Sequence, residues 1–264
     1  MGTGAWIYRG GVTLVLAAGS MLDQSAAAMI EAAAAAGFAG VGLRVSSPAT
    51  EPNGIDDVDS VRQLAAHRGI VIHDAEVYRI GSPVGPHAVI DRAAAVGAAS
   101  VLVVSDVAGR DHTLRALDEI VRIADPLGLR IALEYMAWTY PSTPLEAIDV
   151  ALASGCEVVV DVLHHVRVGA GTSELQAVVA SGTLAWVQLC DAPLAAPRDG
   201  DLIGEARHGR LLPGAGELPL AELLACVPDG TTVSVEVQSD ALSTLDAGVR
   251  AALLYEAARS IVGR

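Results

Sequence analysis

Short apolar runs rich in β-branched residues alternate along the chain with longer segments rich in alanine and leucine. The short runs are continuously apolar, which is typical of strands buried on both faces of a parallel sheet. They predict strands at residues 12–17, 39–45, 70–75, 100–105, 130–135, 157–162, 184–190 and 232–237. The segments between them predict helices at residues 25–37, 55–69, 87–97, 111–128, 144–155, 173–182, 218–227 and 244–262. Most of these helices end at a glycine, the residue that adopts a left-handed cap most easily.

Eight strand–helix units in a chain of 264 residues have the size and order of an α/β barrel of the (β/α)8, or TIM, type. An open, doubly wound sheet is the alternative. However, no GxGxxG follows the first strand, and no GxxxxGK[ST] occurs in the chain. Composition does not shift along the sequence, so we expect residues 1–264 to form a single domain. The longest connection, residues 192–217, is expected to be structureless and to cover a site.

Composition narrows the classes of function. Hydrophobic residues make up 52% of the chain and charged residues 18%, which excludes a disordered protein. Acidic residues outnumber basic ones by 31 to 17, and a net charge of −14 repels nucleic-acid phosphates. All of the basic residues are arginines, so no lysine is present for a Schiff base, for covalent pyridoxal phosphate or for a P-loop.

Cysteine usage and hydropathy predict a cytoplasmic protein. Cys156, Cys190 and Cys226 are far apart and form no CxxC pair, so no disulfide framework is expected. The apolar segment at residues 12–22, behind Arg9, imitates part of a signal peptide, but it is short and fits a first buried strand better. No apolar run reaches the ~20 residues that a membrane span needs. We therefore expect neither a membrane nor a nucleic-acid partner.

Polar residues interrupt the apolar pattern near the C-terminal ends of four consecutive strands. Side chains at these ends of a parallel barrel converge on the mouth where substrates bind. Three buried carboxylates meeting there would repel one another unless a divalent cation joined them. The alternative is that each carboxylate pairs with an arginine, such as Arg44 or Arg130. The four polar residues are Glu134, Asp161, Gln188 and Glu236.

Six segments carry a resemblance to a known family: GFAGVGLRV, ALEYMAW, VVVDVLHH, WVQLCDAP, EARHGRLLPGAGELPL and VSVEV. They resemble the sugar phosphate isomerase/epimerase family of xylose isomerase-like TIM barrels, which includes ketose 3-epimerases, inosose dehydratases and hydroxypyruvate isomerases. The resemblance implies that Glu134 and Glu236 exchange the proton as acid and base. It also implies that His164, in the segment DVLH, touches a substrate hydroxyl, and that Arg210, in RLLPG, reaches the substrate. The metal ligands that it implies are Glu134, Asp161, Gln188 and Glu236.

One position departs from the family pattern. Many members carry histidine on the seventh strand, where this chain has Gln188. The resulting set of oxygen ligands favours Mn²⁺ or Mg²⁺, with Co²⁺ and Zn²⁺ as alternatives. His165 would restore a nitrogen ligand, but neighbouring residues on a strand face opposite ways. We therefore expect His164 to enter the site and His165 to pack elsewhere.

Several further residues are weaker candidates. His73 and Glu76 follow the third strand, and we expect His73 to bind substrate at the mouth. Trp138 follows the fifth strand and would stack on the apolar face of a sugar ring. Asp191 would orient a ligand or an arginine from behind the site. Arg207, in the long connection, would add positive charge to an acidic protein.

The chemistry that the resemblance implies is proton abstraction beside a carbonyl, through an enediolate that the metal stabilises. On a keto sugar or polyol this gives isomerisation or epimerisation. If the enolate expels a β-leaving group instead, the protein is a lyase, as in inosose dehydration or elimination from a 3-keto-glycoside. Phosphorylated substrates are less expected, because the chain has no lysine.

Two other functions remain as alternatives. Endonuclease activity at abasic DNA shares the fold, but the net charge opposes it, and the fourth and seventh strands do not end in histidine. The second alternative is a metal-free protein that binds a sugar or a partner protein. Barrels of this family often pair, so we also expect a homodimer or another homo-oligomer, with the alanine-rich outer helices at its interface.

Overall fold

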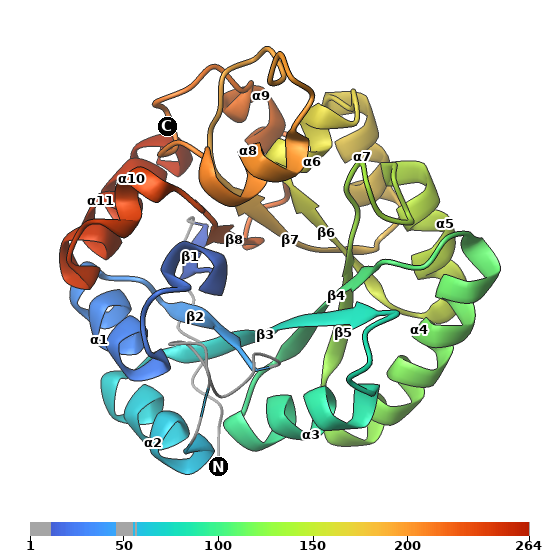
Figure 1. Cartoon of the computed structure of the whole chain (residues 1–264), viewed down its shortest axis with the longest axis horizontal. Coiled ribbons are helices and arrows are strands. Elements are labelled where there is room, and N and C mark those ends of the chain that lie inside the picture. The colour runs from blue at the N-terminus through green and yellow to red at the C-terminus, as the bar shows by residue number, and fades with distance from the viewer. Residues whose placement is uncertain (1–11, 46–54, 56, 264) are drawn as a thin grey trace.

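The computed structural model describes residues 12–45, 55 and 57–263. Within these ranges, parallel strands β1 to β8 close into a barrel that helices surround (Figure 1). Closure is made by β1 and β8, which pair in register from Thr13 beside Thr232 to Leu16 beside Val235. The predicted TIM barrel is thus confirmed. Arg9 and Asp56, which bear on two of the predicted segments, lie outside the described residues.

The strands lie close to where the apolar runs predict them, with one exception. The third strand continues to Ile80 instead of ending at Ala75, so Glu76 and Arg79 belong to the sheet. The strands are Thr13–Leu16 (β1), Gly40–Arg44 (β2), Val71–Ile80 (β3), Ser100–Ser105 (β4), Arg130–Glu134 (β5), Glu157–Asp161 (β6), Leu184–Leu189 (β7) and Thr232–Val235 (β8).

The outer helices also follow the predicted order, but the second half of the chain holds additional short ones. The longer helices are Ala26–Ala36 (α1), Val58–Arg68 (α2), Pro86–Val96 (α3), Arg110–Ala124 (α4), Pro144–Ser154 (α5), Thr172–Ala180 (α7) and Ala247–Val262 (α11). The short ones are Val162–Arg167 (α6), Leu202–His208 (α8), Leu220–Leu224 (α9) and Asp240–Ser243 (α10), with 3-10 turns at Ala18–Met21 (η1) and Asp125–Leu127 (η2). Among the described helices, none has the length and apolar character that a bilayer span requires.

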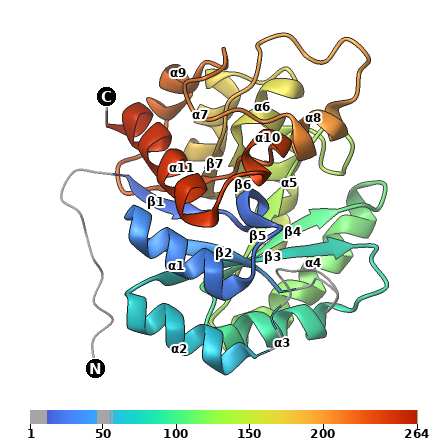
Figure 2. The ribbon, with the colours of Figure 1, turned by 60° about the vertical axis from the view of Figure 1, so that its left-hand side comes forward.

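Local sequence explains where the first helix begins and ends. The Ser25 side chain accepts a hydrogen bond from the backbone N–H of Ala28, which caps the start of α1. Gly37 ends it with a φ of 100°, a conformation that glycine adopts without a steric penalty. The chain then turns into β2, and the Phe38 ring packs edge-on against Tyr255 of α11, with centroids 5.1 Å apart. Figure 2 shows α11 lying beside α1 at this seam.

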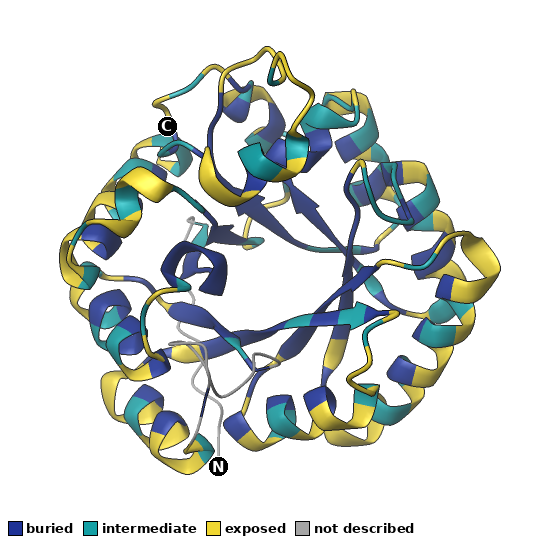
Figure 3. Cartoon of the chain, in the orientation of Figure 1, coloured by how far each residue is buried: buried dark blue, intermediate teal, exposed yellow. Residues whose placement is uncertain are grey.

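Successive side chains of each strand face opposite sides of the sheet, and they pack into two separate apolar cores. Residues that point outward pack under the helices in one large apolar cluster, whereas Leu102, Ala132, Val159 and Trp186 form a second cluster from β4 to β7. Their strand neighbours, such as Val158 and Val160, belong to the outer cluster, so the second cluster fills the barrel interior. Figure 3 shows the buried strands inside a ring of helices whose outer faces are exposed.

The connection after β7 is not structureless, which corrects the sequence-based expectation. It contains helix α8, whose start is capped by the Asp201 side chain. The Asp191 carboxylate, at the beginning of the connection, accepts hydrogen bonds from the backbone N–H groups of Ala192, Gly214, Gly216 and Leu218, at 2.8–3.0 Å. One buried side chain therefore gathers distant parts of the connection over the barrel mouth.

Candidate active site at the barrel mouth

Strand alternation places three of the predicted residues on the inner face of the barrel. Glu134 lies two residues beyond Ala132, and Asp161 lies two beyond Val159, so each projects one layer above the inner core. Gln188 stands in the same relation to Trp186 and pairs in register with Asp161. Glu236 directly follows β8. All four are buried, and Glu134 and Glu236 line the cavity at this end of the barrel.

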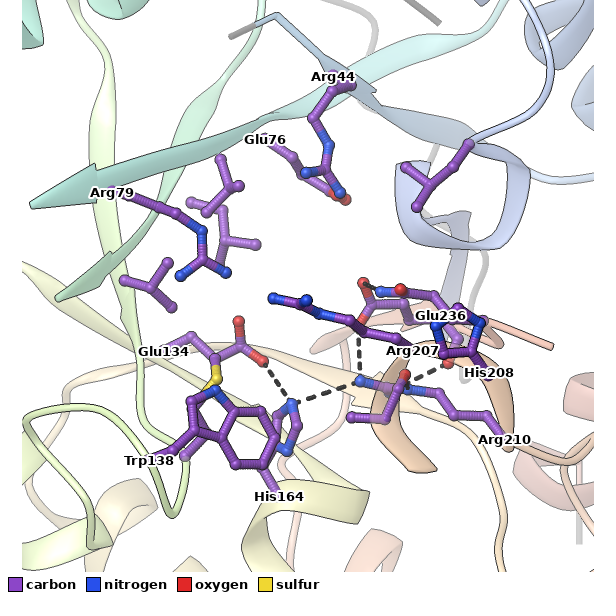
Figure 4. A pocket seen from close by; sticks show the side chains of 17 residues that line it. Arg44, Glu76, Arg79, Glu134, Trp138, His164, Arg207, His208, Arg210 and Glu236 are labelled. Atoms are coloured by element: carbon purple, nitrogen blue, oxygen red, sulfur yellow. Dashed lines mark hydrogen bonds and ion pairs between the residues drawn. The ribbon is translucent and has the colours of Figure 1, made fainter. Parts of the chain in front are cut away.

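A cavity of about 320 Å³ opens at this end of the barrel. Figure 4 shows the side chains that surround it. Three carboxylates, Glu76, Glu134 and Glu236, line the cavity together with four arginines. The arginines are Arg44, Arg79, Arg207 and Arg210. A volume of this size suits a small ligand.

Glu134, Asp161 and His164 form a compact group of possible metal ligands. One donor atom from each lies within 4.8 Å of the other two. Asp161 caps α6 by accepting a hydrogen bond from the His164 backbone N–H at 3.0 Å. Glu134 Oε1 lies 3.6 Å from His164 Nε2. Burial, reinforced by the negative charges of Glu236 and Asp161, raises the pKa of Glu134 well above its usual value.

Arg210 sits behind this group and is almost completely buried. Its Nη1 lies 2.5 Å from Asp161 Oδ2, and its Nη2 lies 3.4 Å from Glu236 Oε2. Its Nε donates to the Ala206 carbonyl at 2.8 Å, and Nη1 also reaches the Cys190 thiol. Burial alone would raise the pKa of Asp161, but the Arg210 and His164 contacts outweigh burial and lower it. The alternative of arginine pairing is therefore true for Asp161 and Glu236, although the partner is neither Arg44 nor Arg130.

Glu236 approaches the cavity from the other side. Burial raises the pKa of its carboxyl group to about 7, against the opposing effect of Arg210. Gln238 Nε2 lies 3.4 Å from Glu236 Oε1. Gly19 of η1 packs so closely that a Cβ there would collide with the same oxygen. The Glu236 carboxylate thus fits beside η1 because residue 19 has no side chain.

Gln188 presents a polar atom without a partner. Its Oε1 is buried and accepts no hydrogen bond from the described part of the chain. A buried acceptor of this kind costs about 1–3 kcal/mol unless a donor or a cation satisfies it. Gln188 is not among the residues that line the cavity.

His164 and His165 point to different places, as expected, but for a different reason. They lie on helix α6 and not on a strand, because Asp161 starts a helix directly after β6. His164 faces the cavity. His165 packs behind it, with Nδ1 2.6 Å from the Tyr135 hydroxyl and Nε2 2.8 Å from the Gly171 carbonyl. Burial lowers the pKa of His164 to about 4, so its ring is neutral near pH 7.

The two remaining predicted substrate contacts differ in position. Trp138 lines the cavity, and its ring lies edge-on to His164 with centroids 5.1 Å apart. His73 is not among the lining residues. It packs against Trp186 with ring centroids 4.9 Å apart, because β3 carries a register irregularity beside it, between the pairs Val41–Ile72 and Gly42–Asp74. The structure therefore places His73 against the inner core and not at the mouth.

The third strand is longer than the sequence pattern predicted. Glu76 and Arg79 line the cavity because β3 reaches that far, and Glu76 lies beside the buried Asp74. Burial and the nearby charges of Glu76 and Glu236 raise the pKa of Asp74 well above its usual value. The apolar Val77 and Ile80 after Glu76 are the signal that would have extended the strand.

Comparisons with known proteins agree with this architecture. No curated protein sequence matches the chain. Several solved structures, by contrast, match the chain. A "xylose isomerase-like TIM barrel/4-hydroxyphenylpyruvate dioxygenase fusion protein" has 24% identity and a TM-score of 0.79, over 94% of this chain but only 42% of its own. The IolI protein with a bound zinc atom has 16% identity and a TM-score of 0.80, over 96% and 98% of the two chains.

A third structure, D-allulose 3-epimerase from Methylomonas sp., has 17% identity and a TM-score of 0.70, over 95% and 98% of the chains. At these identities the structural similarity shows a shared fold. The sequence itself matches the family of xylose isomerase-like TIM barrels over residues 30–257. The chain therefore belongs to the xylose isomerase-like TIM barrel family.

Proposed function

We propose that the protein is a metal-dependent enzyme that moves a proton beside the carbonyl of a keto sugar or related polyol, and so isomerises or epimerises it. One observation carries the proposal: Glu134 and Glu236 are buried carboxyl groups with raised pKa values that face the same cavity. Acid–base catalysts need pKa values near the working pH, and burial is a common way to obtain them. Epimerase and IolI structures share the fold.

The residues present fit a divalent cation. Glu134, Asp161 and Glu236 supply carboxylate oxygens, and Gln188 supplies a buried amide oxygen that has no partner. Mutual repulsion contributes to the raised pKa of Glu134, and a cation would relieve it. These oxygen donors suit Mn²⁺ or Mg²⁺. His164, in the compact group with Glu134 and Asp161, is an additional candidate ligand.

A bound cation would polarise the substrate carbonyl and favour the enolate form. The protein's own groups would move the proton. Glu236 lines the cavity, and burial raises its pKa to about 7 in the absence of a cation, so it is suited to remove a proton and return one. Glu134 lines the same cavity and would exchange the proton from the other side of the substrate.

The surrounding residues would position the substrate and exclude water. His164 is neutral and can exchange a hydrogen bond with a substrate hydroxyl. Arg210 already uses its donors on Asp161, Ala206 and Glu236, so its role would be to hold these groups in place. The apolar face of Trp138 and the neighbouring Met136 would cover the hydrophobic side of a sugar.

Solvent deuterium exchange tests the proposal. The protein is incubated in D2O with Mn²⁺ and a panel of keto sugars and keto-inositols, and the products are followed by NMR and mass spectrometry. We expect deuterium beside the carbonyl without loss of mass from the carbon skeleton or its hydroxyls. Deuterium uptake accompanied by loss of water or an aglycone would identify the lyase reaction instead.

Two variants and a control sharpen this test. Glu134→Gln and Glu236→Gln should each abolish exchange, because neither amide can accept or return the proton. Glu256→Gln, an exposed carboxylate on α11, removes the same charge and should leave exchange unchanged. Exchange that survives in both site variants, or its absence across the whole panel, would contradict the proposal.

A further inference from the structure

Arginine side chains converge on the cavity from three separate elements. Arg44 comes from the end of β2, Arg79 from β3, and Arg207 from α8. Figure 4 shows their guanidinium groups directed toward the cavity from different sides. This gathering stands out because the protein as a whole has a net charge of −14. Clustered cations in an acidic protein need either acidic partners or an anionic ligand.

Arg44 has more hydrogen-bonding capacity than its partners use. Among the described residues its one ion pair is a contact of 3.7 Å from Nη2 to Glu76 Oε2, which is too long for a hydrogen bond. Glu76 Oε1 already accepts from the Ala18 backbone N–H at 3.0 Å. The Nε of Arg44 is buried and has no partner among the described residues. A guanidinium so placed can bind an oxyanion through two parallel N–H groups.

Arg207 is also free to bind. Within the described part of the chain it has neither an ion pair nor a side-chain hydrogen bond, although it lines the cavity. The acidic residue on the same helix, Glu205, is committed to Arg167 by contacts of 2.6 and 2.7 Å. The His208 side chain next to it pairs with Asp240. The charge of Arg207 is therefore not neutralised by its neighbours on α8.

Arg79 differs from the other two. Its Nη1 contacts both carboxylate oxygens of Asp106, at 2.8 and 3.0 Å. Much of its charge is thus balanced inside the protein. It provides an internal comparison, because it lines the same cavity while its charge is paired with Asp106.

Arg44 lies across the barrel from Asp161 and from the groups beside it. In a closed barrel of strands β1 to β8, β2 stands opposite β6, which carries Asp161. Glu134 and His164 lie beside Asp161. A substrate whose carbonyl end lay among these groups would therefore extend its other end toward Arg44. Arg207, on the connection that covers the mouth, would close over that end.

We propose that the substrate carries an anionic oxygen group, a carboxylate or a phosphate, at the end remote from its carbonyl, and that Arg44 and Arg207 bind this group. The inference rests on the proposed function, because it names the class of sugar on which the same site acts. The two anions share the bidentate hydrogen-bonding chemistry that arginine recognises. A keto sugar acid and a keto sugar phosphate are therefore the two sources to be compared. The phosphate returns to consideration, despite the absence of lysine, because the arginines at the cavity can supply the positive charge.

A matched set of probes separates these sources from a neutral sugar. D-fructose, D-fructuronate and D-fructose 6-phosphate differ only in the group at the carbon farthest from C1, and the D-tagatose series repeats the comparison with one inverted centre. Dissociation constants are measured by isothermal titration calorimetry with the full chain, with and without Mg²⁺. We expect an anionic probe of at least one series to bind about tenfold or more tightly than its neutral counterpart. The preference should decrease as salt is added, because the free guanidinium groups are partly exposed.

Three variants decide whether the named arginines cause the preference. Arg44→Gln and Arg207→Gln should each reduce the ratio of neutral to anionic dissociation constants toward one. Arg115→Gln, an exposed arginine on α4, removes the same charge far from the cavity and should leave the ratio unchanged. Circular dichroism checks the fold. Arg207 is exposed, so its variant decides the question even if Arg44→Gln does not fold.

Equal affinities for neutral and anionic probes, or no binding of any anionic probe, would overturn the inference. A preference that persists in Arg207→Gln would overturn the assignment of that residue. Deuterium exchange on the same probes separates this result from the proposed function. Exchange without an anion preference would remove the inference and leave the proposed function standing. An anion preference without exchange on any probe would remove the proposed function and leave only an anion-binding site at Arg44 and Arg207.

Discussion

Arg210 and Asp161 form a buried ion pair in which Nη1 and Oδ2 are 2.5 Å apart, although the two residues are 49 positions apart in the chain. The side chains are 2% and 0% exposed. The pair joins the connection after β7 to the end of β6. It also explains why the pKa of Asp161 is lowered while the pKa of Glu134 beside it is raised. The most ionised carboxylate of the site is thus the one that an arginine holds.

Replacing Arg210 should destabilise the protein strongly. Arg210→Met leaves the buried Asp161 and Glu236 without their cation, and breaking a buried ion pair costs about 3–5 kcal/mol. Urea unfolding measures the change. Added Mn²⁺ should restore part of the loss, because a second cation can take the place of the guanidinium charge. A variant as stable as the parent chain in the absence of metal would show that the pair contributes nothing.

Asp191 should stabilise the connection without touching the cavity. Asp191→Ala leaves the N–H groups of Ala192, Gly214, Gly216 and Leu218 without their common acceptor. We expect a loss of about 3 kcal/mol in urea unfolding and faster proteolysis within residues 192–217. Asp229→Ala, an exposed carboxylate, is the matched control. Unchanged proteolysis in Asp191→Ala would mean that other contacts hold the connection.

Gly19→Ala should impair catalysis more than stability. The new methyl group collides with Glu236 Oε1 and comes within 2.9 Å of Gln238 Nε2, and both are ends of side chains that can move. Displacing a catalytic group by ~1 Å costs about 10²-fold in rate. The exchange rate and the melting temperature are measured together. Gly85→Ala has no atom within 4 Å of its new Cβ and serves as the control. Full activity in Gly19→Ala would argue against a role for Glu236 in this position.

His73 should make the protein sensitive to acid. Burial lowers its pKa from 6.5 to about 4, so the unfolded chain binds a proton in this range while the folded chain does not. Stability is therefore complete above pH 6.5 and falls as the pH drops toward 4, by as much as about 3 kcal/mol from this residue. His73→Phe keeps the ring against Trp186 and removes the titrating group, whose Nε2 has no partner among the described residues.

The pH dependence of unfolding in His73→Phe should consequently be flatter between pH 6.5 and 4. It will not vanish, because burial also lowers the pKa values of His164 and His165. The exposed His87→Phe is the control. An identical slope in His73→Phe and the parent chain would show that His73 does not bury a neutral ring.

The barrel and the inward direction of its carboxylates were predictable because both follow from short-range periodicity. Continuous apolar runs identify buried parallel strands, and a period of two residues sets Glu134 above Ala132 and Asp161 above Val159. Helix starts were less accurate, since α6 begins directly at the end of β6 once the Asp161 side chain caps it. That cap depends on a side-chain hydrogen bond that no hydropathy pattern records.

Contacts between distant segments were not predictable. Arg210 reaches Asp161 only because α8 and the Asp191 hydrogen bonds fold the long connection back over the mouth. Glu76 and Arg79 line the cavity because β3 continues through polar residues that broke its apolar pattern. His73 turned away from the mouth at an irregularity in the pairing of β2 and β3, which single-sequence reasoning does not reveal. The metal ligands and the proton-transfer roles stay predictions.

Anomalous diffraction from crystals soaked with Mn²⁺ tests the central claim most directly. The account predicts one strong peak at the barrel mouth, with oxygen atoms of Glu134, Asp161, Gln188 and Glu236 at about 2.0–2.6 Å. It also predicts that the peak disappears in Glu134→Gln crystals that keep the same fold. A map of the parent protein with no peak between these side chains at saturating Mn²⁺ would contradict the account.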